Sequence, residues 1–137
     1  MRYTSKNAIS ISIEFVHLAL SKLSVEQSLI DELLHTCRIP KHLLDEPSAR
    51  VSLLQFAQLM GGLTQATNDE YIGHGTSALP VGSLSLLTHW LVAAETLDQA
   101  AERITRFYEM MGQGQAIHSV YDSQSIVFEI DIPADKS

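Results

Sequence analysis

The sequence has one cysteine, few basic residues and no long apolar run, and each shortage excludes a class of protein. Cys37 has no partner for an internal disulfide, which excludes a disulfide-stabilised secreted scaffold. Basic residues number 9 against 16 acidic ones, a formal net charge of -7, which argues against nucleic-acid binding by this chain. No stretch approaches the roughly 20 apolar residues that span a bilayer, and the polar start makes a poor signal peptide. We therefore expect a cytoplasmic protein that does not bind membranes.

What is present is the composition of a folded domain. Hydrophobic residues make up 45% of the 137 residues, enough for one apolar core. We expect a single regulatory domain over 9–132, with a flexible N-terminus at 1–8 and a tail at 133–137. The length is short for two domains.

Most of the chain predicts helices, about five in number. Apolar residues recur every three or four positions over about 9–22, and again after each of three capping boxes: Ser24 with Gln27, Ser52 with Gln55, and Thr96 with Gln99. A short helix is expected at 41–44, after Pro40. The run at 84–94 is so apolar that we expect the central helix there.

Two helices carry more detailed expectations. Gly61 and Gly62 indicate either close packing against another helix or a kink beside a pocket. In the helix that follows Thr96, the spacing predicts a buried face and an exposed one. The buried face comprises Leu97, Ile104, Phe107 and Met111, and the exposed one Glu102 and Arg103.

After Gly114 the apolar period changes from 3.6 to 2, which predicts a β-hairpin with its turn at 122–124. The fold class is therefore α+β, mainly α, with a C-terminal antiparallel β-hairpin. An isolated hairpin is marginal in water and leaves open edges. We expect it to pair in a homodimer, with Ile126, Phe128 and Ile130 at the interface.

The side chains of this sequence favour binding over catalysis. No nucleophile or phosphate-loop motif is found, so we expect no enzyme and no catalytic residues. His35, Cys37 and His42 match no zinc spacing, and we expect no metal and no cofactor. A ligand pocket near 84–94 would combine an apolar wall with a few polar groups. The candidate ligand-binding residues are His89, Trp90, Arg106 and Tyr108, and the alternative is that Trp90 and Tyr108 are simply part of the core.

One ordered series of short stretches carries a family resemblance. The stretches are 33–39 (LLHTCRI), 44–51 (LDEPSARV), 67–73 (TNDEYIG), 82–87 (GSLSLL), 95–100 (ETLDQA) and 106–108 (RFY). From about 12 to about 132 the sequence resembles the N-terminal effector domain of AraC-type bacterial transcription regulators, catalogued under an arabinose-binding label.

The resemblance implies a regulatory domain that senses an unidentified small-molecule effector and forms a homodimer. It also implies that DNA is bound only through a C-terminal domain with two helix-turn-helix units, which we expect to be absent from this chain. The alternative function is a helical dimerisation or interaction module without a ligand.

Overall fold

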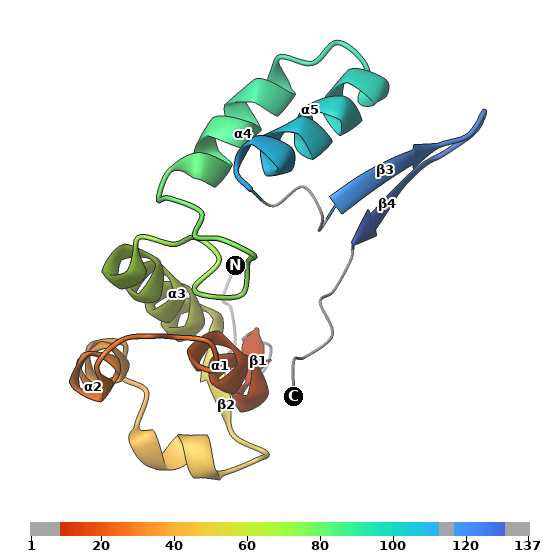
Figure 1. The fold of residues 1–137 in the computed structure, drawn as a ribbon. Coiled ribbons are helices and arrows are strands. Elements are labelled where there is room, and N and C mark those ends of the chain that lie inside the picture. Colours follow the sequence, from red (N-terminus) through yellow and green to blue (C-terminus); the bar gives the residue numbers. More distant parts are fainter. Residues whose placement is uncertain (1–8, 113–116, 131–137) are drawn as a thin grey trace, which may run out of the picture. The chain divides into compact units, whose positions relative to one another are not determined.

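The computed structural model describes residues 9–112 and 117–130. These residues form helices α1 to α5, a short 3-10 helix and two antiparallel strand pairs (Figure 1). The fold class is α+β and mainly α, as the sequence predicts. The predicted flexible N-terminus at 1–8 and tail at 133–137 lie outside the described residues.

The chain divides into two compact units, Met1–His74 and Gly75–Ser137. The single domain over 9–132 stays a prediction. Within the described ranges, no helix is both long and apolar enough to cross a membrane.

The first unit opens with a strand that the sequence did not predict. β1 (Ser10–Ser12) pairs antiparallel with β2 (Arg50–Ser52), with Ile11 opposite Val51. The Arg50 guanidinium donates to the Ser10 hydroxyl at 2.6 Å and to the Ser10 carbonyl at 2.8 Å. The helix expected at about 9–22 is therefore shorter: α1 covers Ile13–Leu20, and the Ser12 hydroxyl accepts a hydrogen bond from the Glu14 amide.

Three further helical segments complete this unit: α2 (Gln27–Thr36), the 3-10 helix η2 (Lys41–Asp45) and α3 (Leu53–Thr67). The capping box predicted at Ser24 is wrong, because the N-cap of α2 is Glu26 and no side chain caps it. The box predicted at Ser52 is confirmed. The Ser52 hydroxyl accepts from the Gln55 amide at 3.0 Å, and the Gln55 side chain accepts from the Ser52 amide at 2.8 Å.

The core of the first unit is built from these helices and β2. Its least exposed members are Ile13, Val16, Leu34, Ile39, Val51, Leu59 and Leu63. The α3 helix continues through both glycines without a break. A Cβ on Gly62 would lie 2.7 Å from Leu33 Cδ2, whereas one on Gly61 would meet nothing within 4 Å. Close packing against α2 therefore explains Gly62, and the helix is continuous at this site.

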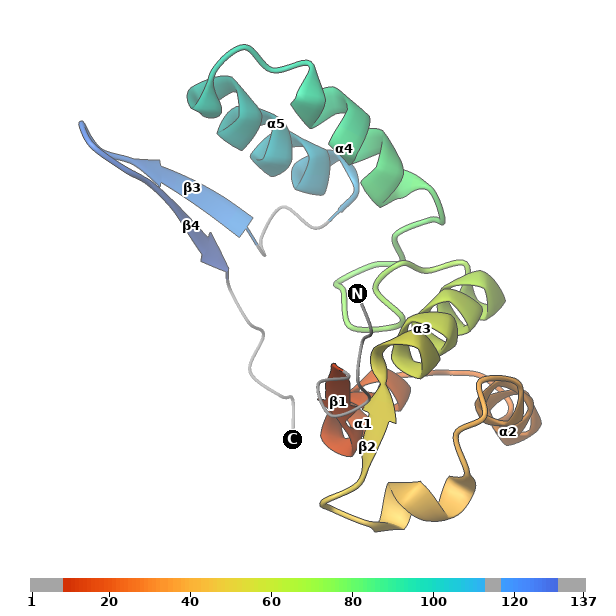
Figure 2. The same ribbon diagram turned by 180° about the vertical axis from the view of Figure 1, so that it is seen from behind.

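The second unit contains α4 (Ser83–Val92), α5 (Leu97–Met110), β3 (Ile117–Tyr121) and β4 (Ile126–Ile130). Figure 2 shows α4 and α5 side by side. The expectation that the apolar run at 84–94 forms a central helix is wrong. Only Ser83 and Leu87 of α4 are buried, while Leu86 is 63% and Val92 82% exposed. Within the described part of this unit α4 packs against α5, which covers only part of the apolar surface of α4.

The predicted cap and end of α5 are confirmed, but its predicted faces need correction. The Thr96 hydroxyl accepts from the Gln99 amide at 3.2 Å, and Gly112 follows the helix with a φ of 74°. Phe107 is buried as expected, whereas Leu97 is 79% exposed. Arg103, expected to be exposed, is half-buried because it lies over α4.

Candidate functional site

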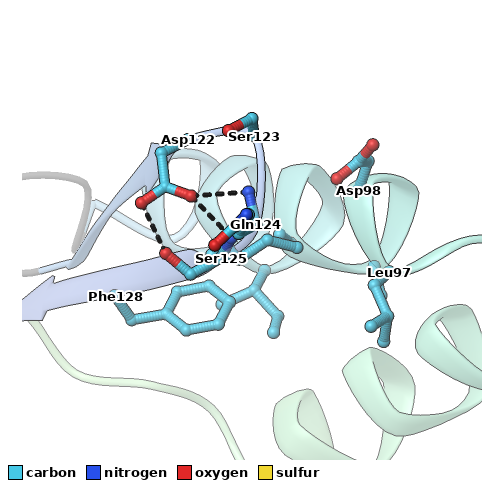
Figure 3. Close-up of a pocket in the computed structure, with 11 residues that line it drawn as sticks. Leu97, Asp98, Asp122, Ser123, Gln124, Ser125 and Phe128 are labelled. Carbon is cyan, nitrogen blue, oxygen red and sulfur yellow. Dashed lines mark hydrogen bonds between the residues drawn. The ribbon is translucent and has the colours of Figure 1, made fainter.

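A groove in the second unit lies between α5 and the β3–β4 hairpin (Figure 3). Its volume is about 610 Å³, within the range of small-molecule sites. One wall comes from α5 and the other from β4 with the hairpin turn. The lining residues are Leu97, Asp98, Ala100, Ala101, Ile104, Asp122, Ser123, Gln124, Ser125, Ile126 and Phe128.

The apolar walls follow from the periods of the two elements. On α5 the apolar lining residues are spaced by three or four positions, and on β4 Ile126 and Phe128 are two apart, so they share a face. Val127 lies between them and belongs to the opposite face of the hairpin. Phe128 is 43% exposed, so a large aromatic surface is available in the groove. This arrangement can bind an apolar group.

The same face of the hairpin is tied to α5 by hydroxyl groups. Thr105 Oγ1 lies 3.1 Å from Ser119 Oγ, and Ser119 is the strand partner of Phe128. In an antiparallel pair, directly opposed residues lie on the same face. The face that carries Phe128 therefore packs toward α5, and the register of the hairpin positions the wall of the groove.

The polar end of the groove is the hairpin turn, which is organised by Asp122. Its carboxylate accepts from the Gln124 amide at 2.7 Å, the Ser125 amide at 2.6 Å and the Ser125 hydroxyl at 2.7 Å, as Figure 3 shows. The Ser125 hydroxyl and the two amides lower the pKa of this carboxyl group below its usual range. The turn therefore keeps a negative charge beside the groove at neutral pH.

The four ligand-binding residues predicted from the sequence do not line this groove. His89 is exposed, and its Nδ1 lies 2.7 Å from the Ser85 carbonyl oxygen of its own helix. Arg106 is also exposed. Tyr108 is half-buried and stands edge-on to Phe107, with ring centroids 5.3 Å apart. The ligand-binding role of these residues stays a prediction.

Trp90, the fourth of these residues, is paired with an arginine that the sequence reasoning placed in solvent. The Arg103 guanidinium carbon lies 5.7 Å from the centre of the Trp90 ring, and Arg103 Nη1 donates to the Trp90 carbonyl at 2.6 Å. This contact joins α5 to α4. The pattern of polar and apolar residues along α5 placed Arg103 on the polar face of the helix. That pattern gives no information about which helix packs against this face.

The residues predicted for dimerisation include two that line the groove, Ile126 and Phe128. The side chain of Ile130 lies outside the described residues. The alternation of apolar residues along β4 identified the apolar face of this strand. It did not show that α5 lies opposite part of that face. The groove residues of α5 were missed for that reason.

Metal chemistry finds no support among the described side chains. No group of three His, Cys, Asp or Glu residues in this part of the chain could hold a metal ion. Cys37 belongs to the core of the first unit, and its burial raises the pKa of the thiol. A buried thiol that stays protonated is a poor nucleophile and a poor ligand.

The comparison with protein families decides which group of proteins the chain belongs to. A family profile described as the arabinose-binding N-terminal domain of AraC transcription regulators matches residues 30–136. The chain belongs to this family. The matched stretch contains every lining residue of the groove. The family is a regulatory domain of transcription regulators and not a class of enzymes. Neither the curated proteins nor the solved structures yielded a match.

Proposed function

We propose that this domain senses a small-molecule effector in the groove between α5 and the β3–β4 hairpin, and that it controls transcription in response. The observation that carries the proposal is the composition of the groove. Apolar side chains from a helix and a strand face each other across it, and a polar turn closes one end. Small-molecule sites combine apolar walls with a few polar groups in this way. The family description also supports an effector site within the matched residues 30–136, which include the groove.

The mechanism is a shift between two positions of the hairpin relative to α5. A ligand that contacts both Ile104 and Phe128 favours the arrangement in which the two walls are the right distance apart. The ligand shifts the equilibrium only by its difference in affinity for the two arrangements. The Thr105–Ser119 contact is one of the links that such a shift would change.

We also propose that the hairpin mediates homodimerisation, so that its position is transmitted to the regulator. The sequence predicts the interface at Ile126, Phe128 and Ile130, but Ile126 and Phe128 line the groove. We therefore propose the opposite face of the hairpin, where Val120 and Val127 are directly paired and are 48% and 49% exposed. In the described residues β3 and β4 pair only with each other, which leaves strand edges for a second copy. In this proposal DNA is bound by another part of the regulator, and the regulator is a cytoplasmic protein.

The ligand site is tested with two matched variants of β4. Phe128→Thr removes an aromatic wall of the groove, and Val127→Thr introduces the same residue one position away on the other face. Phenylbutanol serves as a neutral apolar probe, and heteronuclear NMR titration of the full chain measures its affinity. We expect Phe128→Thr to weaken binding at least roughly tenfold, from the loss of an aromatic contact surface, and Val127→Thr to leave it unchanged. Equal affinities for the two variants refute the groove as the site.

Dimerisation is tested by sedimentation at micromolar concentration. The unmodified chain should sediment as a dimer of the 15.1 kDa chain. Val127→Lys should dissociate it, because a charged side chain cannot be buried without a partner. A clean monomer of the unmodified chain overturns the dimer. If Phe128→Thr keeps its ligand while Val127→Lys loses the dimer, the domain is a dimerisation module without this effector site.

A further inference from the structure

The charges at the groove are of one sign, and this bears on the ligand it accepts. Asp98 lines the groove from the first turn of α5, and Asp122 lines it from the hairpin turn. A second cleft, lined by Asp98, Gln99, Glu102 and Asp122, shares these two carboxylates. Three carboxylates therefore border a continuous stretch of surface next to the apolar walls.

No basic side chain among the described residues of this unit offsets that charge in the groove. Residues 75–130 contain six carboxylates and two arginines, a difference of -4. Arg103 is engaged by the Trp90 ring and carbonyl. Arg106 lies nine positions after Leu97, which is about two and a half turns and places it on the other side of the helix. Neither arginine lines the groove.

The two groove carboxylates differ in how many hydrogen bonds they accept. The Asp122 carboxylate accepts three hydrogen bonds within its own turn, which keep it ionised and hold it in place. Asp98 is exposed and has no hydrogen-bond or ion-pair partner in the part of the chain that the structure describes. In Figure 3 the side chains of Asp98 and Leu97 extend from the first turn of α5 in different directions. Asp98 lines the same groove as Ile104 and Phe128, so the groove offers a ligand both apolar side chains and a carboxylate.

We propose that the effector groove takes an organic cation with an apolar body, such as an arylalkylamine, and discriminates against carboxylates and phosphates. This rests on the proposed function, since it names the ligand class of the same groove. The apolar body lies between Ile104 and Phe128, and the ammonium group lies at Asp98. Attraction at Asp98 favours a cation, while repulsion from Asp98, Asp122 and Glu102 disfavours an anion.

The test compares three probes that share one apolar body and differ in the head group: phenylbutylamine, phenylbutanol and phenylbutyrate. Affinities for the full chain are measured by NMR titration at low salt and again at about 0.5 M salt, where exposed charges are screened. The amine should bind roughly three- to tenfold tighter than the alcohol, as expected for one exposed ion pair, and the carboxylate should bind weakest. The spread should shrink at high salt.

Matched variants assign the preference to one residue. Asp98→Asn should bring the amine to the affinity of the alcohol and leave the alcohol unchanged. Glu109→Gln removes the same charge from the same helix outside the groove and should leave the order intact. Far-UV circular dichroism confirms that both variants are folded.

The outcomes separate the two proposals. If phenylbutyrate binds as tightly as phenylbutylamine, or if Asp98→Asn keeps the amine preference, the cation proposal is overturned while the groove stands. If the alcohol binds and Phe128→Thr does not weaken it, the groove itself fails. If none of the three probes binds, both proposals are refuted.

Discussion

The two adjacent glycines of α3 allow the packing of this helix to be tested with one substitution made twice. Gly61→Ala and Gly62→Ala add the same methyl group to the same helix, one residue apart. At Gly61 the new Cβ meets nothing within 4 Å. At Gly62 it would lie 2.7 Å from Leu33 Cδ2, which is closer than carbon atoms approach, so Leu33 must move.

The magnitudes follow from these surroundings. Alanine in a helix interior is favoured over glycine by about 1 kcal/mol, so Gly61→Ala should raise the free energy of unfolding of the first unit by up to that amount. Gly62→Ala has the same propensity gain, but overpacking typically costs about 1–3 kcal/mol. The net effect at Gly62 should lie between about zero and 2 kcal/mol of destabilisation. The two variants should therefore differ by about 1–3 kcal/mol.

The contact with Leu33 can be isolated by a double-mutant cycle. Leu33→Ala removes the δ carbons, so Gly62→Ala made in that background should stabilise by about 1 kcal/mol, as at Gly61. Urea unfolding followed by far-UV circular dichroism gives the overall change. Hydrogen exchange of the α3 amides reports the first unit alone. Equal effects of Gly61→Ala and Gly62→Ala, or no coupling to Leu33, would refute the close packing of α2 and α3.

Three further predictions concern the second unit. Phe107→Ala should lower its free energy of unfolding by about 3–5 kcal/mol because residue 107 is 1% exposed, whereas Leu97→Ala should change it by less than about 0.5 kcal/mol. Unfolding followed by Trp90 fluorescence measures both changes. Equal losses of stability in the two variants would contradict the assigned buried face of α5. Thr96→Ala should cost about 1 kcal/mol in the same assay through the lost cap of α5, and an unchanged midpoint would argue against the cap. Because hydrogen bonds lower the pKa of Asp122, this group stabilises the hairpin above its ordinary pKa of about 3.9 and loses that effect as pH falls through the lowered pKa. Protection of the hairpin amides should therefore fall in acid in the native chain and stay flat for Asp122→Asn; parallel profiles would sink this assignment.

Much of the local structure could be predicted from the sequence because its causes are local. The capping box of Ser52 and Gln55, the cap at Thr96 and the glycine after α5 depend on residues within one turn of the helix. The alternation of β4 and the turn residues at 122–124 likewise predicted the hairpin. The family resemblance was also in the sequence, since all six quoted stretches lie within the matched residues 30–136.

The incorrect predictions share a physical cause. Each depended on which element of the fold packs against another, and local sequence patterns do not contain that information. The β1–β2 pair joins residues 38 to 42 positions apart, and each strand has only three residues, too few for a period to be detected. The apolar character of α4 suggested a central helix, but burial depends on how many neighbours cover a helix, and Leu86 and Val92 remain exposed.

The candidate site shows the same division. The sequence determined the two apolar faces separately, one on the helix after Thr96 and one on the strand containing Phe128. Only the tertiary structure decided that Ile104 and Phe128 line one groove, that Asp98 and Asp122 share its border, and that Arg103 lies against Trp90 instead of in solvent. Helical and strand periods specify which side chains share a face of their own element. Which two faces meet is set by long-range packing, and no local pattern encodes it.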